Sequence, residues 1–125
     1  MRSDLAVAIL ISAFALLQGK ASVAQEVCTE PQAPAPVDGA QLSEDQMRAA
    51  MAAARTFIAQ SDVYRACLAN AVDAARTQAS ADGKPFDPAV ESDARAKAEA
   101  NQREKDKVGV AINTAVGVYK QTHLK

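Results

Sequence analysis

The sequence predicts an all-α fold: an antiparallel hairpin of two long helices, with a proline-rich N-terminal arm stapled to it by a disulfide. Residues 44–81 contain neither proline nor glycine, and their apolar residues recur every three or four positions, which is the spacing of one helical face. A second helical pattern starts after Asp87 and runs to about residue 122. The chain has two cysteines. Cys28 precedes the prolines of the arm, and Cys67 falls within the first predicted helix.

Residues 1–24 have the layout of a secretory signal peptide. The basic Arg2 precedes an apolar run over residues 5–17, and the small residues Ser22 and Ala24 fit a cleavage site after position 24. A retained membrane anchor is the alternative, but the run is shorter than the roughly twenty apolar residues that span a bilayer. We therefore expect a periplasmic or secreted protein that keeps no stable membrane anchor after cleavage.

The composition of the exported part argues against two classes of partner. Removal of residues 1–24 leaves 12 of the 14 basic and 14 of the 15 acidic residues, with both signs interspersed. Nucleic acid is not expected as a partner, because phosphate binding needs clustered positive charge. No polybasic segment is present to bind anionic lipid. About 100 residues make one small domain, and an alanine-rich core of this size commonly needs a disulfide or an oligomer for stability.

The arm, residues 25–42, is predicted to be extended, because three prolines within six positions forbid a helix. Cys28 and Cys67 allow a single intramolecular pairing, and an oxidising compartment favours it. Closing a loop of about 40 residues contributes roughly 4 kcal/mol in the chain-entropy treatment. A redox pair is the alternative reading, but the cysteines lack the C-x-x-C spacing that tunes a thiolate.

The first helix, residues 44–81, has strong signals at both ends. Ser43 as N-cap and Gln46 as its N3 partner make a capping box, and Leu42 and Met47 occupy the hydrophobic-staple positions. Gly83 is placed to end the helix. A helix reaching from Ser43 to Cys67 is about 36 Å long. The extended arm reaches about 46 Å, so it can run back along the helix to the disulfide.

The residues around this cap also resemble a known signature. Leu42-Ser43-Glu44-Asp45-Gln46 is similar to the L-T-x-x-Q motif of small helical periplasmic stress proteins and chaperones, with serine in place of threonine and one copy instead of two. The resemblance implies binding of unfolded client proteins. A capping box alone explains the same five residues.

The second helix, residues 88–122, begins at Asp87 as N-cap with Pro88 at the first helical position. Residues 108–119 are ambiguous, since β-branched residues and two glycines also suit a strand. Val108, Ile112 and Tyr119 nevertheless keep helical spacing, and a single strand would have no partner. We predict a helix here.

A short connection makes the two helices an antiparallel hairpin. Turning near residues 84–85 would place Ile58 level with Ala111 and Ile112, and Leu68 level with Asn101. A line of small residues, Gly109, Asn113 and Gly117, permits close approach of the first helix, the arm or a second subunit. If a second subunit approaches there, we expect a homodimer that forms a four-helix bundle.

One apolar stripe is the candidate interaction surface, and its alternative role is the internal core of the hairpin. The stripe consists of Met47, Met51, Ile58, Val108, Ile112, Val116 and Tyr119.

No motif predicts catalysis, a metal or a cofactor. His123 is the only histidine, the two cysteines are expected to pair, and neither a phosphate-binding loop nor a nucleophile elbow is present. We expect an exported, non-catalytic helical protein that acts through protein–protein contacts, as an envelope interaction or accessory module. The alternatives are a client-binding chaperone and a small-ligand carrier with its site between arm and hairpin.

Overall fold

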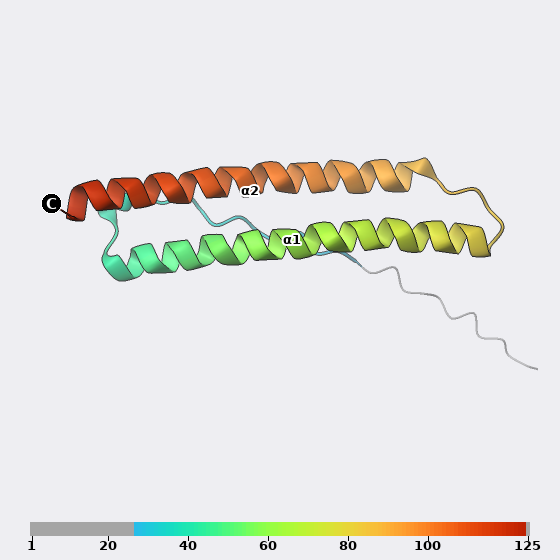
Figure 1. Ribbon diagram of the computed structural model, residues 1–125, viewed down its shortest axis with the longest axis horizontal. Coiled ribbons are helices and arrows are strands. Elements are labelled where there is room, and N and C mark those ends of the chain that lie inside the picture. The colour runs from blue at the N-terminus through green and yellow to red at the C-terminus, as the bar shows by residue number, and fades with distance from the viewer. Residues whose placement is uncertain (1–26, 125) are drawn as a thin grey trace, which may run out of the picture.

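The computed structural model describes residues 27–124, in which two long helices lie side by side and antiparallel (Figure 1). Helix α1 spans Glu44–Ala81 and helix α2 spans Pro88–His123, preceded by a single 3-10 turn, η1, at Gly39–Gln41. The all-α hairpin is therefore confirmed, and residues 108–119 are helical. The predicted signal peptide, residues 1–24, lies outside the described residues.

Both helices begin at side-chain caps. The backbone N–H of Gln46 donates to Ser43 Oγ over 3.3 Å, and the N–H of Ser43 donates to Gln46 Oε1 over 2.9 Å, which together form the capping box. At the start of α2, Asp87 Oδ1 accepts a hydrogen bond of 2.9 Å from the N–H of Ala89. Pro88 occupies the first turn, where a missing N–H costs nothing.

Helix α1 ends in a Schellman motif. Gly83 adopts a φ of 63°, its N–H donates to the Ser80 carbonyl, and the N–H of Lys84 donates to the Ala79 carbonyl. The left-handed backbone at this position favours glycine because no Cβ is present to clash. The chain leaves α1 in a turn and reaches α2 within six residues.

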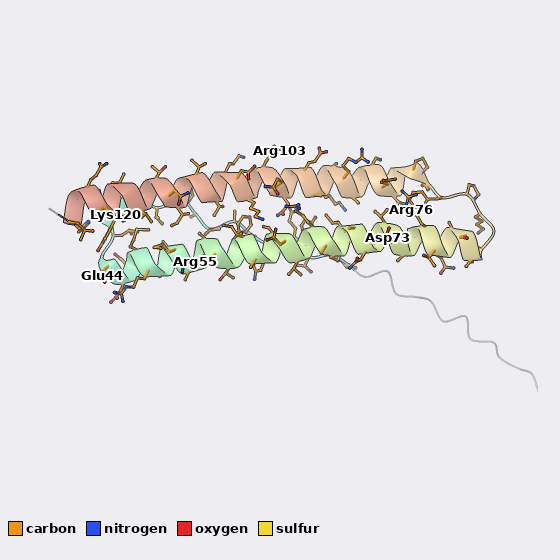
Figure 2. The ribbon with its side chains drawn as sticks, viewed as in Figure 1. Glu44, Arg55, Asp73, Arg76, Arg103 and Lys120 are labelled. Atoms are coloured by element: carbon orange, nitrogen blue, oxygen red, sulfur yellow. A yellow bond between two sulfur atoms is a disulfide. The ribbon has the colours of Figure 1, made fainter. Side chains whose placement is uncertain are left out.

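The register of the hairpin differs from the prediction. The Arg76 guanidinium lies 4.4 Å from the centre of the Phe86 ring and pairs with Glu91 over 2.5 Å. The connecting segment therefore runs back along α1, and the end of α1 extends past the start of α2 (Figure 2). As a result, Asn101 donates a hydrogen bond to Ser61, where the symmetric turn predicted Leu68.

The arm forms a third layer on the hairpin. A disulfide joins Cys28 to Cys67 in the middle of α1, as the sequence predicted. From there the arm runs back toward the start of α1, and η1 packs against α2 (Figure 1). Gly39 is buried at that contact. A Cβ built on it would lie 1.9 Å from the Ala115 carbonyl oxygen, so only glycine fits this approach.

The core is a thin line between the helices. Within residues 27–124, the buried apolar side chains are Met47, Ala54, Phe57, Tyr64, Leu68, Val72, Val108 and Ala115. Ala54, Phe57 and Val108 cluster together, with Ile112 packed against them. Six of these eight residues lie on α1 and only two on α2, because the middle of α2 is strongly polar. So small a core leaves apolar residues only partly covered on the flanks.

Candidate functional site

The seven residues of the predicted interaction stripe lie along the line between the helices. Met47 and Val108 are buried, with exposed fractions of 4% and 8%, and the other five are half-buried. Much of the stripe therefore takes part in the internal contact of the hairpin. The half-buried members can face either the flank of the hairpin that carries the arm or the opposite flank.

On α1, two of them face away from the arm. Ile58 precedes Cys67 by nine positions, and about 100° per residue places it on the opposite side of the helix from the disulfide. Met51 lies on the same side as Ile58, one heptad earlier. Neither side chain is covered by the arm.

The corresponding flank of α2 also faces away from the arm. Lys107 lies beside the arm, and Val116, nine positions later, therefore faces the other way. Gly109 shares the side of Val116, one heptad earlier, and both are half-buried. We call these four residues, Met51, Ile58, Gly109 and Val116, the open patch.

Polar contacts between the helices close the same flank nearer the loop. Lys105 Nζ pairs with Asp62 over 2.5 Å, and Arg65 donates a hydrogen bond to Gln102. The Lys105 hydrogen bond and charge lower the pKa of the Asp62 carboxyl, with a smaller contribution from Arg65. The open patch is thus bounded on one side by a polar bridge and carries no charge of its own.

A buried polar pair lies beneath this flank. Asn101 Nδ2 donates to Ser61 Oγ over 3.3 Å, and these side chains are 1% and 0% exposed. Among the described residues, Asn101 Oδ1 has no hydrogen-bond partner. Leaving a buried oxygen unpaired is costly, so the pair contributes little net stability to the hairpin. Sequence reasoning missed this pair, although Ser61 sits at a helical step from Phe57 on the apolar face.

A buried tyrosine lies three residues before Cys67 on α1. Tyr64 is 5% exposed, and its pKa is raised by burial and, to a lesser extent, by the negative charge of Glu30 in the arm. The disulfide holds the beginning of the described arm beside this part of α1.

The described residues offer few groups for metal or acid–base chemistry. Within 27–124, no group of three or more His, Cys, Asp or Glu side chains is placed to hold a metal ion. The His123 ring is exposed at the end of α2, where it stacks on Tyr119 with ring centres 4.4 Å apart. Among the helices of the same residues, none is long and apolar enough to cross a membrane.

Two residues of the line of small residues on α2, Gly109 and Gly117, have open space at the position of a side chain. A Cβ added at Gly109 or Gly117 would meet nothing within 4 Å. The expectation that the first helix or the arm approaches closely there is therefore wrong at these two glycines; the close approach occurs at Gly39 instead. A second subunit is the option that stays open.

Comparison of the chain with protein-family models, with curated proteins and with solved structures finds no match. Its function must therefore be inferred from its own geometry.

Proposed function

We propose that the chain is an exported, non-catalytic helical protein that acts through protein–protein contacts in the periplasm or outside the cell. The observation that carries the proposal is the open patch, a set of four uncharged, half-buried residues contributed by both helices. Export is supported by the signal-like sequence of residues 1–24 and by the disulfide, which is stable in oxidising compartments.

The partner that fits this patch is a second copy of the chain. Two-fold contacts are self-complementary, so α1 residues of one patch can meet α2 residues of the other. Pairing two hairpins in this way produces a four-helix bundle with coiled-coil-like packing. Gly109 would let the helices come close, and the thin core of a single hairpin leaves stability to be gained by association.

A charge at Gly109 tests the proposal. Gly109→Glu adds a side chain where a Cβ meets nothing within 4 Å, so the hairpin itself should fold normally. If the open patch is the interface, desolvating this carboxylate should weaken dimerisation at least about tenfold. Sedimentation velocity over a range of concentrations measures the dissociation constant.

Val110→Glu is the matched control, because Val110 is the next residue but is 68% exposed and points to another side of α2. Its dimerisation should match that of the unmodified chain. A chain that is monomeric at every concentration, or equal effects of the two substitutions, would refute association through the open patch.

A further inference from the structure

A hollow lies between the arm and the two helices, on the flank opposite the open patch. Its volume is about 670 Å³. One wall is the arm at residues 33–37, the second is α1 around Ala50 and Ala53, and the third is α2 around Val108 and Ala111. We call it the arm groove. Its size falls in the range of small-molecule sites, which is about 300–1,000 Å³.

The groove is hollow because its walls carry short side chains. Seven of its sixteen lining residues are alanine, and they come from all three walls. A methyl group cannot bridge the space between an arm and a helix, whereas leucine at the same positions would fill it. On α1, lining positions 46, 50 and 54 follow one helical row of about 12 Å, so the groove is elongated.

The residues that line the groove are mostly apolar. Thirteen of the sixteen residues are apolar, and Pro34 and Pro36 deprive the arm wall of two backbone donors. The two charged residues neutralise each other, since Lys107 Nζ lies 2.7 Å from Glu104 Oε1. The amide oxygen of the third polar residue, Gln46, is engaged in the capping box of α1.

We propose that the arm groove binds an uncharged, elongated hydrocarbon molecule of medium length, such as the chain of a neutral lipid. Apolar cavities of this kind take up apolar molecules rather than water. A charged group seated among the apolar walls would lose its hydration, and the one cation of the lining, Lys107, is shared with Glu104. The proposal is independent of self-association, which uses the other flank of the hairpin.

Binding is tested on the oxidised protein with the neutral fluorescent probe N-phenyl-1-naphthylamine, displaced by three chains of equal length. These are 1-decanol, decanoate and decylamine, which carry no charge, a negative charge and a positive charge. The alcohol should displace the probe at about tenfold lower concentration than either ion.

Two substitutions locate the site, one on each helical wall. Ala53→Leu and Ala111→Leu extend side chains into the groove and should each weaken probe binding at least about fivefold by occupying its volume. Ala52→Leu is the control, because Ala52 is exposed on α1 and does not line the groove. Thermal melts and circular dichroism verify that all three variants remain folded.

Each outcome of the displacement and substitution experiments either supports or refutes hydrocarbon binding in the arm groove. Preferential displacement by decanol, together with loss of binding in both groove variants, supports the proposal. Absence of probe binding overturns it, and equal or better displacement by an ion overturns the chemical class. Unchanged binding in the groove variants would place the probe elsewhere, for example on the open patch, and would also refute the assignment. None of these results depends on whether the protein dimerises.

Discussion

Gly39 makes the tightest contact between the arm and the hairpin. The turn η1 brings its backbone against the carbonyl of Ala115 and the backbone nitrogen of Tyr119. Glycine is therefore required here for close approach to α2. Spacing alone directed attention to Gly109 and Gly117, because a glycine that makes a long-range contact looks no different from any other in a sequence.

Gly39→Ala should destabilise the protein by roughly 1–3 kcal/mol, the usual scale for forcing extra atoms into a packed contact. The added Cβ would overlap the backbone of α2, which has no free side-chain end to move aside. Urea unfolding measures the difference. Gly117→Ala is the counterpart: its Cβ meets nothing, so helix propensity should raise stability by up to about 1 kcal/mol. Equal stability of the Gly39 variant and the unmodified protein would contradict the tight contact.

Both ends of α1 and the start of α2 could be predicted from the sequence because caps are local. Ser43, Gln46, Gly83 and Asp87 each act within a few residues of their position, and the structure places these three helix ends where they indicate. The register between the helices could not be predicted, because it depends on the path of the loop and on Phe86 folding back onto Arg76. The arm groove also escaped detailed prediction, since its volume depends on how far apart three segments come to rest.

Ser43→Ala tests whether the start of α1 is only a cap. Losing the Ser43 side chain should cost roughly 1 kcal/mol, because the N–H of Gln46 loses its acceptor. A thermal melt and an assay of aggregation suppression with an unfolding client protein are run on the same sample. Loss of stability alone supports the capping role. Suppression that is lost without any change in the melt would support the client-binding alternative that the L-S-E-D-Q sequence implies.

The hairpin has a thin core and the arm supplies its third layer. The Cys28–Cys67 disulfide is the covalent link that holds this layer on the hairpin. Each helix is roughly 55 Å long, yet the buried apolar cluster between them consists of Ala54, Phe57 and Val108, with Ile112 packed against it. The arm runs along one flank, where residues 33–37 lie beside both helices. Over its described residues, 27–42, the arm contains no regular element apart from η1, so the disulfide and the η1 contact fix its two ends.

Replacing both cysteines, Cys28→Ser with Cys67→Ser, should lower the free energy of unfolding by about 2–4 kcal/mol, the range typical of a disulfide that closes a loop of this length. The helices retain their caps, so far-ultraviolet circular dichroism at low temperature should change little.

The arm, held then only at η1, should become the first site of proteolytic cleavage in the same double variant. Probe binding in the arm groove should fall as well, because one wall is no longer fixed. Urea unfolding, limited proteolysis and probe fluorescence on one preparation follow these three effects. An arm that resists proteolysis in the variant would show that its packing on the helices, rather than the disulfide, holds it in place.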